Sequence, residues 1–133
     1  MENQLTVRPI KFRAWDEVNK RFSRAPVYIN QEGETLMDCD PNGIQMSGKR
    51  SIMHKEYVIQ QFTGFKDSKG QEIYEGDVFE PEDGEDFSGF VKWEDGRWCI
   101  NWGGKYSDPC TDYHMDAFKV IGNIYENPEI LSF

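Results

Sequence analysis

The sequence has no long hydrophobic run, and it contains only three cysteines and two histidines in 133 residues. No stretch approaches the roughly 20 apolar residues that a membrane-spanning helix needs, and the first five residues lack the pattern of a secretion signal. Cys39, Cys99 and Cys110 are widely spaced and form no Cys-x-x-Cys pair. We therefore expect a cytoplasmic protein with reduced thiols, no membrane segment and no cofactor.

Basic residues are scarce in the second half of the chain. Residues 1–69 carry 11 Lys and Arg against 9 Asp and Glu, or +2, whereas residues 70–133 carry 4 against 15, or −11, which gives the net charge of −9. No basic residue lies between Gly70 and Val91, where eight carboxylates accumulate. Such a field repels phosphate backbones, so the acidic region of residues 72–95 is a poor surface for nucleic acid.

No window has helical periodicity long enough for a substantial helix, whereas aromatic residues make up 14% of the chain. Apolar and basic residues alternate in residues 10–15, which predicts a strand with one buried face. Residues 21–24 are predicted to form its hairpin partner. Residues 57–63 and 118–125 predict further strands, and Pro128 after Asn127 predicts one helical turn. We therefore predict a single all-β domain over residues 1–133. Its expected form is a small SH3-like or related β-barrel with an N-terminal hairpin and one short C-terminal helical turn.

The sequence around Asp95 and Gly96 predicts one hairpin in register. Asp-Gly is the preferred centre of a two-residue type I′ turn. The resulting pairs are Glu94 with Arg97, Trp93 with Trp98, Lys92 with Cys99 and Val91 with Ile100. All the large apolar residues then share one face, so turn chemistry and hydrophobic pattern agree. We predict a hairpin over residues 90–102 with Trp93 and Trp98 as cross-strand neighbours.

Asp112, His114 and Asp116 form an Asp-x-His-x-Asp run, which in a strand would place three metal ligands on one face. Catalytic metal sites usually draw on several segments, so a run around one histidine is more typical of an exposed polar edge. Cys110 lies near His114 in sequence, but a Cys-His nucleophile pair meets across a fold. We expect no bound metal and an ordinary thiol at Cys110.

Glu75 and Asp77 flank Gly76 and have the residue types of a general acid and base. That glycine already has a conformational purpose at a strand entry, which favours a structural role. Residues 103–106 (Gly-Gly-Lys-Tyr) lack the upstream glycine and the downstream Ser or Thr of a phosphate-binding loop, so they predict a turn. We predict no catalytic, cofactor-binding or metal-binding residue and do not expect an enzyme.

Two groups of side chains have the composition of a nucleic-acid interface. The first comprises Trp15, Trp93, Trp98 and Trp102. Base-stacking platforms are set among basic residues, so core packing is the better interpretation of these tryptophans. The second is the basic segment of residues 8–24, which contains Arg8, Lys11, Arg13, Lys20, Arg21 and Arg24. Lys11 and Arg13 would point from one strand face, although a solvated sheet face explains these cations equally well.

Three segments of the sequence, taken together and in this order, form a pattern specific enough to indicate a protein family. They are residues 10–16 (Ile-Lys-Phe-Arg-Ala-Trp-Asp), residues 61–77 with Asp67, Gly70, Gly76 and Asp77, and residues 120–129 (Val-Ile-Gly-Asn-Ile-Tyr-Glu-Asn-Pro-Glu). Together they resemble the YopX family of bacteriophage and prophage proteins, and we call them the signature segments. The resemblance implies a phage or prophage origin, a mostly β fold with a barrel-like core, and a bacterial host cytoplasm. It supplies no catalytic or ligand-binding residue for this chain.

The leading hypothesis is a small non-catalytic adaptor that binds a phage or host protein, because small barrels commonly dock other proteins and no catalytic template fits. In one variant, residues 72–95 imitate the charge of DNA. The alternative is direct nucleic-acid binding through residues 8–24. We also predict a closed homo-oligomer whose interface covers apolar residues of segment 30–50. These residues are Leu36, Met37, Ile44 and Met46.

Overall fold

The hairpin around the Asp-Gly turn has the predicted register. In the computed structural model, β9 (Gly89–Glu94) and β10 (Arg97–Asn101) are antiparallel, with Trp93 opposite Trp98. Both turn residues have positive φ, 53° at Asp95 and 77° at Gly96, as a type I′ turn requires. The prediction for residues 90–102 is therefore confirmed.

The structure describes residues 8–23, 27–37, 51–52, 57–104 and 107–130. The chain divides into two compact units, of which the larger contains residues 1–11 and 61–133 and the smaller contains residues 12–60. The boundary lies within β6 (Tyr57–Lys66). In the described part of the chain, no helix is long and apolar enough to cross a membrane.

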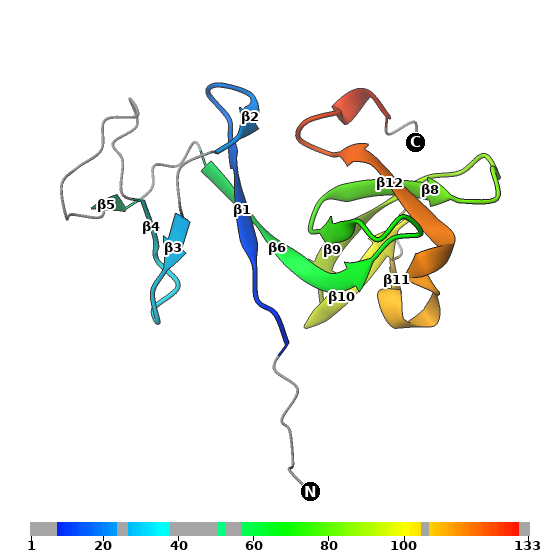
Figure 1. Ribbon diagram of the computed structural model, residues 1–133, viewed down its shortest axis with the longest axis horizontal. Helices are drawn as coiled ribbons and strands as arrows, with labels where there is room; N and C mark the ends of the chain where they lie inside the picture. Colours follow the sequence, from blue (N-terminus) through cyan, green and yellow to red (C-terminus); the bar gives the residue numbers. More distant parts are fainter. Residues whose placement is uncertain (1–7, 24–26, 38–50, 53–56, 105–106, 131–133) are drawn as a thin grey trace, which may run out of the picture. The chain divides into compact units, whose positions relative to one another are not determined.

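The larger unit is built on a five-stranded antiparallel sheet. Its strand order is β11 (Ser107–Pro109), β10, β9, β8 (Asp77–Pro81) and β12 (Phe118–Asn123). The second part of β6 pairs with β7 (Glu72–Tyr74) in this unit. Figure 1 shows the strands curling into a half-barrel. The mainly β, barrel-like fold class is confirmed.

A continuous apolar cluster fills the larger unit. Its buried members are Ile73, Phe79, Val91, Ile100, Cys110, Met115 and Phe118. Trp102 packs edge-on against Phe79 with ring centroids 5.8 Å apart. A Cβ at Gly89 would lie 2.6 Å from the Trp102 ring, so only glycine fits beside it.

Three short 3₁₀ helices complete the described elements of this unit. They are η1 (Cys110–Asp112), η2 (Met115–Ala117) and η3 (Pro128–Ile130). The last begins at the proline that follows Asn127, which confirms the predicted C-terminal helical turn. A Cβ at Gly122 would lie 2.6 Å from Asn127 Oδ1, so the end of β12 packs closely on the approach to η3.

The smaller unit begins with the predicted hairpin, formed by β1 (Phe12–Asp16) and β2 (Arg21–Phe22). The Asp16 carboxylate accepts hydrogen bonds from the backbone N–H groups of Val18 and Asn19 at 2.9 and 3.1 Å. The expected alternation of burial is wrong, since Phe12 is 38% exposed, whereas Ala14, Trp15 and Asp16 are all buried. Both faces of the strand end are covered, because Trp15 packs on Phe22 and Asp16 turns into the loop.

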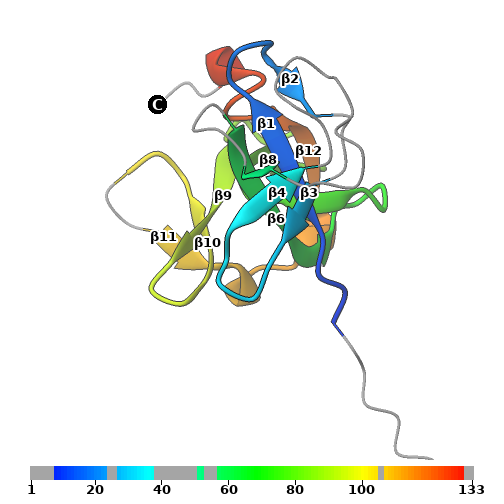
Figure 2. The same ribbon diagram turned by 90° about the vertical axis from the view of Figure 1, so that its left-hand side faces the viewer.

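Segment 27–52 contributes the second sheet of this unit, with strands β3 (Val27–Ile29), β4 (Thr35–Met37) and β5 (Ser51–Ile52) in that order. Figure 2 shows β3 and β4 as a hairpin. Leu36 and Met37 of the predicted oligomer interface lie on β4, whereas Ile44 and Met46 lie outside the described residues. The homo-oligomer stays a prediction.

Candidate functional site

The signature residue Asp67 joins a turn to a distant strand. Its side chain is buried, and its carboxylate accepts hydrogen bonds from the backbone N–H groups of Lys69, Gln71 and Val120 at 2.9, 2.8 and 3.0 Å. Burial raises the pKa of Asp67, but these hydrogen bonds outweigh it and hold the pKa below its usual value. Gly70 closes the turn with φ of 79°, as predicted. The carboxylate therefore holds the β6–β7 turn against β12.

Asp77 forms a second buried link between signature segments. It is 2% exposed, and its carboxylate accepts hydrogen bonds from the backbone N–H of Tyr74 at 2.8 Å and from Asn123 Nδ2 at 3.1 Å. Asn123 is also 2% exposed. Buried polar groups need partners of this kind, because an unpaired one destabilises the fold. Asp77 is thus committed to joining β8 with β12.

Glu75 and Asp77 lie in different surroundings, and these surroundings do not pair them as a general acid and a general base. Burial raises the pKa of Glu75 above its usual value, while Asp77 is engaged by Tyr74 and Asn123. Gly76 between them has φ of 84° and donates its N–H to the carbonyl of Val91 at 2.8 Å. The conformational purpose predicted for this glycine is confirmed.

Asp112, His114 and Asp116 do not share a strand face. Asp112 ends η1, His114 is the extended residue before η2, and Asp116 lies within η2. All three residues are exposed. Over the residues that the structure describes, no group of three or more His, Cys, Asp or Glu side chains is placed to hold a metal ion.

Cys110 lies at the start of η1 and is 1% exposed. Burial, with a smaller contribution from Cys99, raises the pKa of the Cys110 thiol to about 12. At neutral pH only about one thiol in 10⁵ would then be ionised. The thiolate is the nucleophilic form, so this environment suits a packing residue rather than a catalytic one.

The four tryptophans have different environments. Trp15 is 2% exposed in the core of the smaller unit, and Trp102 packs among aromatic residues of the larger unit. Trp93 is 53% exposed and meets Trp98 edge-on, with ring centroids 4.8 Å apart and an interplanar angle of 76°. Core packing is therefore the wrong interpretation for Trp93, whereas its partner Trp98 packs against the apolar cluster of the larger unit.

Several cations of the basic segment 8–24 are engaged by other side chains within their own unit. The contacts are the ion pair of Lys11 with Glu72, the ion pair of Lys20 with Glu17, and the guanidinium of Arg13 placed 4.3 Å from the Phe22 ring centroid. The hydrogen bond with Glu72 raises the pKa of Lys11. Arg21 is exposed, and Arg24 lies outside the described residues.

The acidic region of residues 72–95 is partly neutralised in the same way. Its ion pairs are Glu72 with Lys11, Glu80 with Lys119 at 3.5 Å, Glu82 with Lys69 at 3.1 Å, and Glu94 with Lys92. Asp77 is buried rather than displayed. The field of this region at the surface is thus weaker than the sequence alone suggests.

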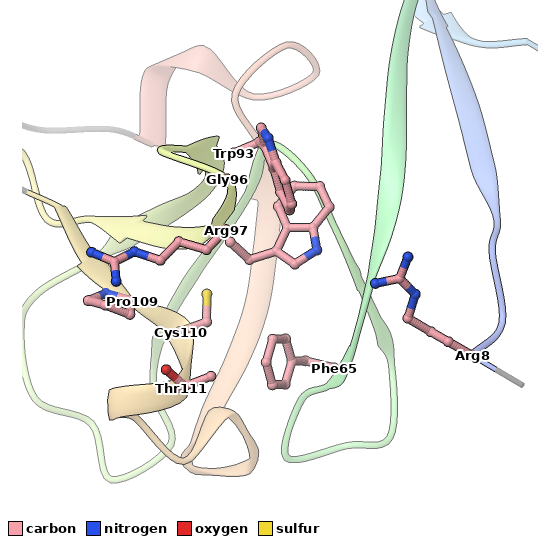
Figure 3. A pocket seen from close by; sticks show the side chains of 9 residues that line it. Arg8, Phe65, Trp93, Gly96, Arg97, Pro109, Cys110 and Thr111 are labelled. Carbon is pink, nitrogen blue, oxygen red and sulfur yellow. The ribbon is translucent and has the colours of Figure 1, made fainter. Parts of the chain in front are cut away.

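A pocket of about 280 Å³ opens beside the pair of Trp93 and Trp98, and we call it the hairpin pocket. Its lining residues are Arg8, Phe65, Trp93, Gly96, Arg97, Trp98, Pro109, Cys110 and Thr111. Figure 3 shows Phe65 and Cys110 in the middle, with Arg97 beside Pro109 on one side and Arg8 on the other. All of these residues belong to the larger unit. The arrangement combines an apolar floor with two cationic flanks.

The electrostatics of the hairpin pocket differ from those of the whole chain. The net charge is −9, yet no carboxylate lines this pocket. Arg8 and Arg97 form neither an ion pair nor a side-chain hydrogen bond with any residue in the described ranges. By contrast, Lys11, Lys20, Lys69, Lys92 and Lys119 all form ion pairs. The two guanidinium groups are thus available to an external anion.

Sequence reasoning missed the hairpin pocket because its residues come from four separated segments. Arg8, Phe65, the hairpin tip and residues 109–111 share no spacing pattern. The sequence did contain one signal of this surface. Trp93 and Trp98 form the second cross-strand pair from the turn, directly after Glu94 and Arg97. Trp98 packs against the apolar cluster, whereas Trp93 is exposed beside the turn, and exposed aromatic surface is typical of a contact surface.

A family model matches most of the chain, and two solved structures share its fold. The model of the family described as YopX protein matches residues 11–132. The chain is similar to the crystal structure of protein EF1440 from Enterococcus faecalis, with a TM-score of 0.64, 26% identity, and coverage of 95% of this chain and 100% of that one. It is also similar to the crystal structure of protein yopX from Bacillus subtilis, with a TM-score of 0.60, 18% identity and the same coverage. No curated protein matches the sequence.

Proposed function

The chain belongs to the YopX family, and from that premise we propose that it is a non-catalytic adaptor of phage or prophage origin that binds a phage or host protein. The proposed setting is the cytoplasm of a bacterial host. The binding surface is the hairpin pocket with the exposed Trp93 at its rim. Exposed aromatic residues next to arginines are the composition that protein interfaces favour.

One observation carries this proposal, the exposure of Trp93 in a well-formed hairpin. Trp93 is 53% exposed, although its cross-strand neighbour Trp98 and the floor beside it are more deeply buried. The hairpin itself needs no such residue at this point, because the Asp-Gly turn already fixes its register. A large apolar side chain that a well-formed hairpin exposes to water supports a role in contact with another protein.

The alternative of nucleic-acid binding through residues 8–24 has less support. Lys11, Lys20 and Arg13 are engaged by neighbouring side chains, so a phosphate would have to compete with these groups. The variant in which residues 72–95 imitate DNA meets a similar objection, because several of their carboxylates are paired with lysines. Both alternatives predict strong dependence on salt.

Capture of proteins from host lysate tests the adaptor proposal. The purified full chain is immobilised, and capture is measured with and without nuclease treatment. We expect a stoichiometric protein partner that survives nuclease. Capture that disappears with nuclease would favour the nucleic-acid alternative, and the absence of any stoichiometric partner would contradict the adaptor.

A matched pair of variants places the surface in the same experiment. Trp93→Ala removes the exposed ring, whereas Phe87→Ala removes another exposed aromatic residue, 44% exposed, that does not line the hairpin pocket. We expect capture to fall at least about tenfold with Trp93→Ala, the loss typical of an interface tryptophan. Phe87→Ala should leave capture unchanged.

A further inference from the structure

We propose that the hairpin pocket recognises an acidic peptide segment that inserts one aromatic or large aliphatic side chain between flanking Asp or Glu residues. This inference rests on the proposed adaptor function and names the chemistry of the partner. Two independent properties carry it, the apolar floor of the pocket and the unpaired cations on its flanks.

The apolar part of the pocket determines which kind of side chain the peptide inserts. Phe65, Trp98 and Pro109 present apolar surface, and Cys110 stays a neutral thiol because burial raises its pKa to about 12. The volume of about 280 Å³ is slightly below the roughly 300–1,000 Å³ of pockets that take drug-sized ligands. Such a space accommodates one large side chain rather than a nucleotide or a cofactor. Trp93 at the rim adds an aromatic face for that side chain to pack on.

The charged part of the pocket determines the charge of the peptide residues that flank the inserted side chain. Arg8 and Arg97 lie on opposite flanks, so an extended peptide that crosses the pocket would bring a carboxylate near each of them (Figure 3). Arginine binds carboxylates with two parallel hydrogen bonds, and neither guanidinium has a carboxylate partner among the described residues. A basic peptide would meet two like charges and is disfavoured.

The occupant is therefore an acidic rather than a basic or purely apolar segment. The net charge of the chain, −9, reinforces this choice because it repels acidic partners elsewhere on the surface. The hairpin pocket differs from that surface, because its lining contains two arginines and no carboxylate.

Selection from a random displayed peptide library, with the full chain as bait, tests the inference directly. We expect enriched peptides in which an aromatic or large aliphatic residue is flanked on both sides by Asp or Glu. Synthetic peptides of the enriched sequence should bind less tightly as salt is raised, because the flanking contacts are exposed ion pairs. A library that yields no enriched sequence, or yields basic ones, overturns the inference.

Variants assign the binding to this pocket. The double variant Arg8→Glu with Arg97→Glu should weaken the enriched peptide at least about tenfold. Lys66→Glu is the control, which reverses one positive charge where the double variant reverses two, because Lys66 is exposed in the same unit and does not line the pocket. Equal weakening by both variants, or by neither, contradicts the inference. Unchanged melting temperatures of the variants confirm that the fold is intact.

The two proposals fail in different ways. If wild-type protein and the Arg8→Glu, Arg97→Glu double variant capture the same lysate protein equally well, the adaptor function stands and the pocket assignment is wrong. If the lysate yields no protein partner while library peptides still bind at the pocket, the pocket assignment stands and the adaptor function is wrong.

Discussion

Two regions of the larger unit use polar and aromatic residues in opposite ways. In the signature region, Asp67, Asp77 and Asn123 are buried and satisfied by hydrogen bonds from other protein groups. At the hairpin tip, Trp93 and Arg97 are exposed, and Arg97 has no ion-pair partner in the described ranges. Asp67, Asp77 and Asn123 of the signature segments thus hold the fold, whereas Trp93 and Arg97, the exposed residues of the proposed binding surface, lie outside those segments.

The physical reason for this division is the cost of a buried charge. A buried carboxylate is tolerated only when several donors surround it, so Asp67 and Asp77 are fully occupied by their structural contacts. A group that is to meet an external partner must instead remain partly unsatisfied in the free protein. Arg8 and Arg97 meet that condition, since neither has an ion-pair partner in the described ranges.

Substitution of Asp77 by alanine is the strongest test of the structural side of this comparison. It removes the carboxylate that accepts hydrogen bonds from the part-buried Tyr74 N–H and the buried Asn123 Nδ2, and we expect a loss of about 3 kcal/mol in the free energy of unfolding. Asp86→Ala, at an exposed position of the same charge, is the control and should change stability by less than about 0.5 kcal/mol. Chemical denaturation measures both. Similar losses for the two variants would remove the distinction.

Asp67 should make stability depend on pH. Its pKa in the folded protein is below the usual value, so its contribution is present above about pH 4 and is lost as pH falls through the folded pKa. Asp67→Asn presents an amide N–H₂ group in place of one acceptor oxygen. We expect the free energy of unfolding to fall by about 2 kcal/mol at neutral pH and to depend less on pH in the acid range. Urea denaturation between pH 6 and 3 measures this, and parallel profiles for the two proteins would contradict it.

Gly96→Val tests the turn that places the tryptophan pair at the hairpin tip. Gly96 has φ of 77°, which a β-branched residue tolerates poorly, so we expect a loss of about 1 kcal/mol or more. Nothing lies within 4 Å of a Cβ at this position, so backbone conformation rather than crowding causes the effect. An unchanged melting temperature would count against the type I′ turn.

Trp93→Ala should have the smallest effect on stability. The ring is 53% exposed, and loss of its cross-strand contact with Trp98 should lower the free energy of unfolding by about 0.5 kcal/mol. Thermal denaturation measures this change. A loss as large as that of Asp77→Ala would mean that Trp93 serves the fold after all.

Local chemistry made part of this structure predictable. The Asp95-Gly96 turn fixed the hairpin register, and the turn at Asp67 and Gly70 has the predicted left-handed closing residue. The burial of β1 was not predictable, because Trp15 is covered by Phe22 and Asp16 by the turn that follows. The hairpin pocket was not predictable from the sequence either, because only tertiary folding brings Arg8, Phe65 and residues 109–111 next to the tip of the β9–β10 hairpin.

Hydrogen–deuterium exchange of the protein alone and bound to its captured partner tests the central claim most directly. If the hairpin tip binds and the signature segments hold the fold, binding should slow exchange in residues 92–98 and 109–111, which contain most of the residues that line the hairpin pocket. Residues 67–77 and 120–127 should exchange at the same rate with and without the partner. Protection confined to those two signature segments, with the hairpin tip unchanged, would contradict the account.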